Sequence, residues 1–219
     1  MRRLGLSRRR SLTPEWVVKV GGSFGARPAA LRRLMETLAA TARRHALLVV
    51  PGGGSFADEV RRVDRRFRLS DSAAHWMAIL AMDQYGHLLQ RLAPGSTLVR
   101  HRRDLRRGRL NVLAPAAWLL RADPLPHSWD VTSDSIAAWI AGALRAPRLM
   151  LVKHAEGLIP PGLSARARRV AVSALGDVLD PYFERALDPA IACWIAPGQR
   201  PQEIARLIET RGERRSLIR

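Results

Sequence analysis

The chain has 219 residues, 47% of them hydrophobic, a composition typical of a globular domain and unlike that of a disordered chain. No apolar run reaches the roughly 18 to 20 residues that a membrane-spanning helix needs, and no hydrophobic stretch of signal-peptide type follows the basic N-terminus. The single Cys193 excludes an internal disulfide and does not indicate a zinc site. We therefore expect a cytoplasmic protein without a membrane partner, with a basic, disordered tail over residues 1–14 and a single domain over residues 15–219.

The charge is unusual, because 37 Lys and Arg stand against 19 Asp and Glu and give a formal net charge of +18. Arginines cluster in segments 2–10, 61–68 and 100–109. The guanidinium group matches phosphate oxygens, so these clusters suit phosphate-rich ligands or nucleic acid, but a merely solvated surface explains them equally well. No aromatic stacking platform and no helix-turn-helix or RNA-recognition signature accompanies them. Nucleic acid is therefore an unlikely partner on this sequence.

The first predicted elements form a strand–helix–strand unit. Residues 17–20 are a short β-branched run that ends at Gly21 and Gly22, and apolar residues then recur at helical spacing over 31–42. Residues 46–50 form a second buried strand, which stops at a proline followed by three glycines. This pattern predicts the βαβ unit of a parallel sheet.

The rest of the chain continues the alternation of helices and strands. Asp71 and Ser72 are the expected N-caps of a long helix over 72–92. Pro201 occupies the first position of the last helix. The remaining expected elements are helices over 57–66 and 72–92, a short strand over 111–113, a loop over 124–127, a helix after 131–134, and strands over 149–152 and 191–195. These elements predict an α/β fold with a mostly parallel sheet.

Two glycine loops are expected at the carboxyl ends of adjacent strands. Segment 19–23, Lys-Val-Gly-Gly-Ser, allows backbone N–H groups to approach phosphate oxygens, although alone it is also an ordinary strand-to-helix turn. Segment 51–55, Pro-Gly-Gly-Gly-Ser, is costly in conformational entropy, which suggests that a ligand or another backbone lies against it. Ligands of open parallel sheets bind at this edge, so the two loops together predict a binding site.

A third segment, Thr-Ser-Asp-Ser at 132–135, precedes a predicted helix. Ser133 or Asp134 as a helix N-cap is a sufficient structural explanation. A functional role is also possible for this segment, because Asp134 can orient Lys19 and the N-terminus of the helix favours an anion.

These three segments, in this order, resemble the signatures of the amino acid kinase superfamily, which includes acetylglutamate, aspartate, glutamate and uridylate kinases. Segments 55–57 and 70–86 are similar to the branch that contains the aminomethylfuran phosphate kinases of methanofuran biosynthesis and their methylotroph counterparts in one-carbon metabolism. The resemblance covers residues 16–208. It implies a three-layer αβα sandwich that binds ATP, Mg²⁺ without a dedicated protein cage, and a small phosphorylated or amine-bearing acceptor. It also implies a homodimer paired through helices that flank the sheet.

The resemblance implies roles for individual residues as well. Lys19 would stabilise the transferring phosphoryl group, and Asp134 would orient Lys19. The expected phosphate- and nucleotide-binding residues are Gly21, Gly22, Ser23, Lys153 and Gly157, and the expected acceptor-binding residues are Gly52, Gly53, Gly54, Arg62, His75, Thr132, Ser133 and Asp180. A structural role is an alternative for two of these, a satisfied core histidine for His75 and a turn or cap before a proline for Asp180.

The nucleotide-facing segment departs from the family pattern. Kinases of this family usually carry Thr-Asp-x-Asp-Gly, whereas residues 153–157 here read Lys-His-Ala-Glu-Gly. A second lysine that commonly follows downstream is absent, and Lys153, Arg166 and Arg168 are the candidates for its charge. The alternative to a kinase is therefore a non-catalytic ligand-binding or assembly subunit with a degenerate nucleotide site.

Overall fold

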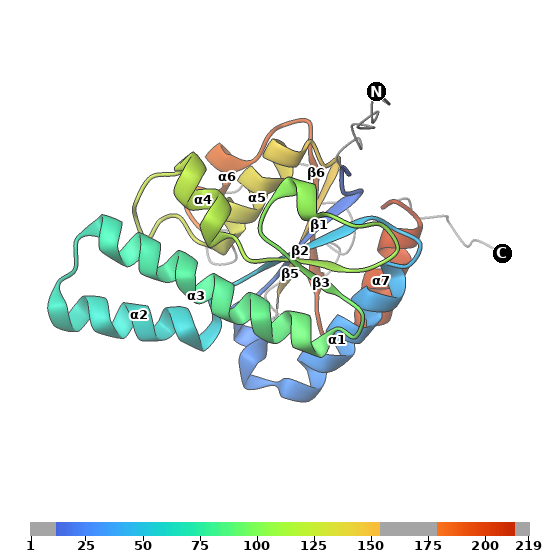
Figure 1. Ribbon diagram of the computed structural model, residues 1–219, viewed down its shortest axis with the longest axis horizontal. Helices are drawn as coiled ribbons and strands as arrows, with labels where there is room; N and C mark the ends of the chain where they lie inside the picture. The colour runs from blue at the N-terminus through green and yellow to red at the C-terminus, as the bar shows by residue number, and fades with distance from the viewer. Residues whose placement is uncertain (1–11, 154–178, 213–219) are drawn as a thin grey trace, which may run out of the picture.

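A central parallel sheet covered by helices on both faces forms the core of the computed structural model, which describes residues 12–153 and 179–212 (Figure 1). All six strands are parallel, in the order β3-β4-β2-β1-β5-β6. The strands are β1 (Trp16–Val20), β2 (Leu47–Pro51), β3 (Thr97–Val99), β4 (Asn111–Leu113), β5 (Arg148–Lys153) and β6 (Ala192–Pro197). The predicted α/β class is confirmed, and the sheet is wholly rather than mostly parallel.

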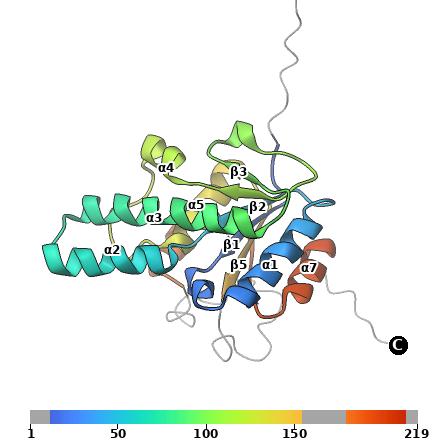
Figure 2. The same ribbon diagram turned by 60° about the horizontal axis from the view of Figure 1, so that its bottom comes forward.

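The helices form two layers and one projecting hairpin. Helices α1 and α7 lie side by side on one face, and α4, α5 and α6 cover the other (Figures 1 and 2). Helices α2 and α3 pack against each other and extend beyond the sheet. The bounds are α1 (Pro28–Thr41), α2 (Gly54–Phe67), α3 (Asp71–Leu92), α4 (Ala116–Ala122), α5 (Ser133–Leu144), α6 (Phe183–Ala186) and α7 (Pro201–Glu209), with 3-10 turns η1 (Gly22–Ala26) and η2 (Arg102–Asp104).

Alternation along β1 divides the core into two halves and directs one polar residue to the site. Trp16, Val18 and Val20 are fully buried against α1, α3 and α7. Val17 is buried on the other face, against α5. Because side chains alternate along a strand, Lys19 also lies on the α5 face.

The two glycine loops lie directly against each other. A Cβ on Gly22 would fall 2.1 Å from the backbone nitrogen of Gly54, and one on Gly52 would fall 2.6 Å from the nitrogen of Gly22. Tyr85 of α3 supports both loops, since its hydroxyl donates to the Gly21 carbonyl at 3.4 Å and its ring lies beneath Gly54. The sequence indicated that a ligand or another backbone lies against the second glycine loop. In the structure, the backbone of the first glycine loop lies there.

We expect Gly22→Ala to destabilise the protein by about 1–3 kcal/mol, the cost of overpacking a filled site. The added methyl group should also push the two loops apart. A displacement of even about 1 Å is expected to lower kcat/KM about a hundredfold. Urea unfolding and a kinase assay measure both effects.

Gly25→Ala is the matched control for this change, because a Cβ there meets nothing closer than 3.9 Å. Equal behaviour of the two variants would contradict the importance of the contact between the loops.

Two predicted helix caps are wrong by one or two residues. The N-cap of α3 is Ser70, whose hydroxyl accepts from Ala73 N, rather than Asp71 or Ser72. The N-cap of α5 is Thr132, rather than Ser133 or Asp134. In both cases the nearest hydroxyl upstream of the helix takes the capping position.

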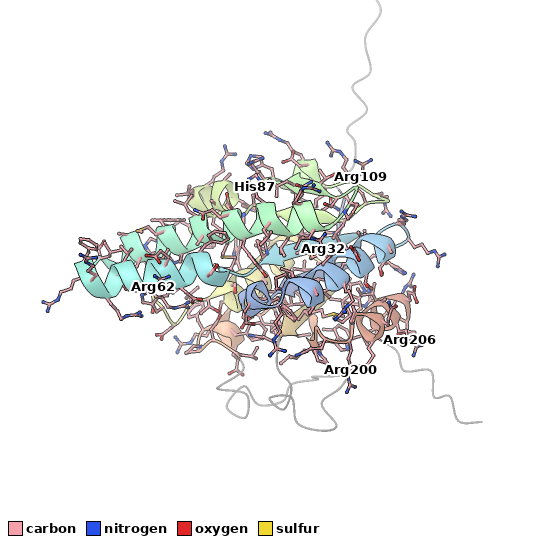
Figure 3. The ribbon with its side chains drawn as sticks, turned by 90° about the horizontal axis from the view of Figure 1, so that it is seen from below. Arg32, Arg62, His87, Arg109, Arg200 and Arg206 are labelled. Atoms are coloured by element: carbon pink, nitrogen blue, oxygen red, sulfur yellow. The ribbon has the colours of Figure 1, made fainter. Side chains whose placement is uncertain are left out.

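No helix within the described ranges is long and apolar enough to cross a membrane. Most of the predicted tail, residues 1–11, lies outside the described residues. Surface arginines occur on several elements, including Arg32 on α1, Arg109 before β4 and Arg206 on α7 (Figure 3).

Candidate active site

Lys19 and Lys153 are brought together by the register of two neighbouring strands. Lys19 in β1 pairs with Leu151 in β5, so Lys153 lies two residues further along on the same face of the sheet. Both ammonium groups therefore reach the carboxyl edge on the side of α5. The register thus places the ammonium group of Lys153, one of the three candidates for the missing downstream lysine, beside that of Lys19.

Asp134 in the first turn of α5 binds both lysines. Its Oδ1 lies 2.9 Å from Lys19 Nζ, and its Oδ2 accepts a hydrogen bond from Lys153 Nζ. Burial by itself raises the pKa of the Asp134 carboxyl, but the charges of Lys19 and Lys153 outweigh this and hold the pKa below its usual value. Burial and then the Lys19 charge lower the pKa of Lys153. We call these three residues the Lys–Asp–Lys cluster.

Asp180 fixes the N-terminus of α5. Its Oδ2 accepts from Thr132 N at 3.0 Å, Thr132 Oγ1 at 2.7 Å and Ser135 N at 3.0 Å, and its Oδ1 accepts from the Ser135 hydroxyl. The carboxylate thus satisfies backbone groups that a helix start leaves unpaired. Asp180 is buried and is not part of the cavity lining, so its position favours the structural alternative over contact with an acceptor.

We expect Asp180→Asn to lower the free energy of unfolding by about 2–3 kcal/mol, because it removes the charge from several charge-assisted hydrogen bonds. It should also lower kcat more than it changes KM, since the α5 N-terminus carries Asp134. Urea unfolding and steady-state kinetics measure the two effects.

Glu184→Gln, a charge removal at a nearby exposed position on α6, should leave both quantities near wild type. A loss of stability in Asp180→Asn with unchanged kcat would show that Asp180 does not position Asp134 for catalysis.

A cavity of about 300 Å³ opens at the carboxyl edge of the sheet, between α2, α3 and the start of α5. The Lys–Asp–Lys cluster and both glycine loops line its inner end, apolar side chains of α3 line its middle, and the start of α3 lies at its outer end. Predicted site residues that line it are Lys19, Gly22, Ser23, Gly53, Gly54, His75, Thr132, Ser133, Asp134 and Lys153.

Several predicted residues do not line the cavity. The amides of Gly21 and Gly52 are already engaged, donating to Val152 O at 3.0 Å and Val20 O at 2.8 Å, so the expectation that the Gly21 amide assists the phosphoryl group does not fit this geometry. Arg62 points to solvent on α2 and pairs with Glu59 at 2.5 Å (Figure 3). Gly157, Arg166 and Arg168 lie outside the described residues.

Arg61 lines the outer part of the cavity where Arg62 was expected. Its guanidinium lies 4.7 Å from the ring centroid of Trp129 and 3.1 Å from Asp58 Oδ1. Trp129 in turn donates its indole N–H to Asp64 at 2.8 Å, which fixes the ring against α2. Arg61 belongs to an arginine cluster that is visible in the sequence, whereas no sequence pattern indicated Trp129.

His75 is buried at the outer end of the cavity with an exposed fraction of 9%. Its ring stacks on His127 at 4.3 Å between centroids and meets the edge of Trp76 at 5.0 Å. His127 is held by Ser72 at 2.7 Å and Asp123 at 2.9 Å. Burial, and then the nearby His127, lower the pKa of His75 to about 4, so its imidazole is neutral at physiological pH.

Within the described residues, no group of three or more His, Cys, Asp or Glu side chains is placed to hold a metal ion. The carboxylate at the inner end, Asp134, is engaged by two lysines. The donor set therefore fits a Mg²⁺ ion that arrives on the nucleotide phosphates, as is usual for this small, strongly hydrated ion.

The chain belongs to the amino acid kinase family, whose model matches residues 14–177. Over 149 residues it is 30% identical to the (5-(aminomethyl)furan-3-yl)methyl phosphate kinase of Methanocaldococcus jannaschii, and the match covers 65% of this chain and 67% of that protein. Together the family and this relative identify the protein as a kinase.

The fold is similar to that of two solved nucleotide kinases. The uridylate kinase of Archaeoglobus fulgidus superposes with a TM-score of 0.64 at 18% identity, covering 89% of this chain and 95% of that one. The UMP kinase of Ureaplasma parvum gives a TM-score of 0.61 at 13% identity, covering 89% and 94%. The predicted amino acid kinase-like fold is confirmed.

Proposed function

We propose that this protein is an ATP-dependent phosphotransferase that acts on a small phosphorylated acceptor of the aminomethylfuran type, in the biosynthesis of a one-carbon carrier such as methylofuran. The observation that carries the proposal is the Lys–Asp–Lys cluster at the inner end of a cavity with two glycine loops. The acceptor class rests on the substrate of the Methanocaldococcus jannaschii relative, an aminomethylfuran methyl phosphate.

The two ammonium groups suit the charge that develops during phosphoryl transfer. A phosphate oxygen of the acceptor attacks the γ-phosphorus of ATP in line, the bond to the β,γ-bridging oxygen breaks, and ADP leaves with that electron pair. Lys19 would neutralise charge on the transferring group, and Lys153 would supply the second cation. Because a phosphate acceptor is already an anion at neutral pH, the reaction needs no general base.

The glycine loops and the start of α5 would hold the phosphates between them. Gly22 and Ser23 line the cavity beside Lys19, and Gly53 and Gly54 line it beside α2. Backbone amides in such loops bind phosphate oxygens, and the N-terminus of α5 favours an anion. Thr132 and Ser133 would contact the acceptor from that helix end.

ATP and Mg²⁺ are the proposed cofactors. The metal ion would neutralise charge on the β- and γ-phosphates when bound. The protein itself would contribute the ammonium groups of Lys19 and Lys153, which Asp134 orients.

The alternative of a non-catalytic subunit is not favoured, because the relatives are kinases and the geometry of the site suits phosphoryl transfer. Its motivation was the substitution of Lys153 and His154 for the usual Thr and Asp. The strand register makes Lys153 a partner of Asp134, so this substitution adds a cation to the site.

A cytoplasmic homodimer remains part of the proposal. Three exposed leucines on two neighbouring helices support an interface there: Leu80 and Leu88 on α3 and Leu120 on α4, with exposed fractions of 50%, 38% and 56%. Exposed apolar side chains in neighbouring helices are typical of subunit contacts.

An ADP-release assay with Mg²⁺–ATP and three acceptors tests the proposal: the aminomethylfuran methyl phosphate, UMP and acetylglutamate. We expect kcat/KM for the furan phosphate to exceed the other two by at least about a hundredfold, the discrimination that a few well-placed polar contacts supply. Preference for UMP or acetylglutamate, or no ADP with any acceptor, would refute it.

A further inference from the structure

The middle of the cavity is an apolar section that adjoins the Lys–Asp–Lys cluster. The apolar residues that line it include Ala57 on α2, Ala78, Ile79 and Met82 on α3, and Val131 and Ile136 near the start of α5. The last four of these belong to one cluster of the buried core, with exposed fractions between 2% and 6%. Because core side chains are close-packed, this wall of the section keeps its shape.

The apolar section lies within one to two helical turns of the glycine loops. Tyr85 marks the level of both loops on α3, since its hydroxyl donates to the Gly21 carbonyl and its ring lies beneath Gly54. Met82 and Ala78 precede it on the same helix by three and seven residues, which is about 5 Å and about 10 Å along the axis. A ring joined to a phosphate by one methylene group spans a similar distance, so this section is where the ring of such an acceptor would lie.

The strand order places the apolar section on the acceptor side of the cluster. Helix α2 starts at the glycine loop after β2, whereas Lys153 ends β5, and β1 lies between these two strands. A ring between α2 and α3 therefore approaches the cluster from the β2 side and leaves the β5 side to the nucleotide. Phosphoryl transfer needs the attacking and leaving oxygens roughly in line, and an approach from opposite sides provides this arrangement.

We propose that the apolar section is a ring subsite, which binds a single uncharged ring one methylene group away from the acceptor phosphate, and that Ala78 limits the size of this ring. The inference rests on the proposed function and adds to it the residues that select the acceptor. Ala78 is partly buried whereas the other five named residues are buried, so the free volume of the section adjoins its methyl group.

The chemistry of the ring subsite suits an aromatic ring of low polarity. The thioether of Met82 makes favourable contacts with aromatic rings. The six named side chains offer no strong hydrogen-bond donor or acceptor. A polar ring such as a nucleobase would lose its hydrogen bonds to water there without replacement, so the subsite selects against nucleotide acceptors.

Binding of furan-3-ylmethyl phosphate and of methyl phosphate to the full-length protein, measured by isothermal titration calorimetry, isolates the contribution of the ring. We expect the wild type to bind the furan compound about 10- to 100-fold more tightly, as for the burial of one small apolar ring. Naphthalen-1-ylmethyl phosphate, whose fused rings are larger than the section, should bind at least about tenfold more weakly than the furan compound.

Ala78→Leu fills the ring subsite with three more carbon atoms, and leucine is a good helix former, so α3 should persist. We expect this variant to lose most of the preference for the furan compound. Its KM for the aminomethylfuran methyl phosphate in an ADP-release assay should rise at least about tenfold, while its affinity for ATP stays unchanged. Ala73→Leu is the matched control, because Ala73 lies on the same helix and is also partly buried but does not line the cavity. It should behave as the wild type does.

The two proposals fail on different results. Equal binding of furan-3-ylmethyl phosphate and methyl phosphate by the wild type, or an unchanged preference in Ala78→Leu, overturns the ring subsite, while turnover of the aminomethylfuran methyl phosphate still upholds the proposed function. A higher KM for ATP with an unchanged KM for the acceptor in Ala78→Leu also overturns it, because the nucleotide would then occupy the section. Preference for the furan compound without any ADP release supports the subsite and refutes the proposed function.

Discussion

Replacing Lys19 with methionine is expected to lower kcat about 10²- to 10³-fold, the cost of removing one donor that stabilises charge in the transition state. Lys19 is buried, with an exposed fraction of 5%, and its ammonium lies 2.9 Å from Asp134. Methionine has a similar length and no charge, and Asp134 keeps Lys153 as a partner. The fold should therefore persist while the chemistry fails.

Single-turnover kinetics with saturating ATP and acceptor measure this loss directly. Arg62→Met is the matched control, because it removes a cation from a residue that the resemblance implicated but that the structure places outside the cavity. Its kcat should stay within about twofold of wild type, since surface substitutions away from a site have small effects. A similar loss in both variants, or a full kcat in Lys19→Met, would contradict the role of Lys19.

Asp134→Asn is expected to affect stability as well as activity. The substitution removes the carboxylate charge that bridges the buried ammonium group of Lys19 and the half-buried one of Lys153. Breaking a buried ion pair by removing one partner costs about 3–5 kcal/mol. We expect a loss of this size in the free energy of unfolding, together with a fall in kcat at least as large as that of Lys19→Met.

The stability of Asp134→Asn should depend on pH in a defined direction. Burial and the Lys19 charge already lower the pKa of Lys153, and loss of the carboxylate lowers it further. The unfolded chain then binds more protons than the folded chain below the ordinary lysine pKa of about 10, so stability rises as the pH rises toward that value. Urea unfolding at several pH values measures the slope.

A second substitution in the same background separates charge from packing. Lys153→Met combined with Asp134→Asn removes one of the two uncompensated cations and should recover part of the lost stability. No recovery, together with no dependence on pH, would show that charge repulsion is not the cause of the loss.

The sheet could be predicted from the sequence where strands are long and end at glycines. Residues 17–20 and 46–50 have buried β-branched runs followed by turns, and the structure forms strands there within one residue. The three-residue strand β3 was missed because only one of its residues is fully buried, whereas β4, which is equally short but wholly buried, was predicted. Helix α4 was missed because its first amide is bound by Asp83, a residue 33 positions away.

The site was predictable in part. The lysine and the aspartate of the cluster were found from the order of the motifs, but the placement of Lys153 beside them depends on the register of β1 and β5. No local pattern encodes that register. Likewise, Asp180 contacts the start of α5 across 48 residues of sequence, so its capping role became visible only in the structure.

The outer end of the cavity shows the same limit. Asp71 was assigned a cap, and His127 a loop position, because each has an adequate local explanation. The spacing of Asp71 and His75 by four residues was the available signal that they share a helix face. Only the structure shows that the ring of His75 stacks on that of His127.

Phosphorus NMR of a reaction with Mg²⁺–ATP and the aminomethylfuran methyl phosphate tests the central claim most directly, because it identifies the bond that forms. A kinase that uses the Lys–Asp–Lys cluster to join two phosphates should consume the monoester signal and produce ADP with a second pair of coupled diphosphate signals, in equal amounts. Consumption of ATP that yields only inorganic phosphate, with the monoester signal unchanged, would contradict the account.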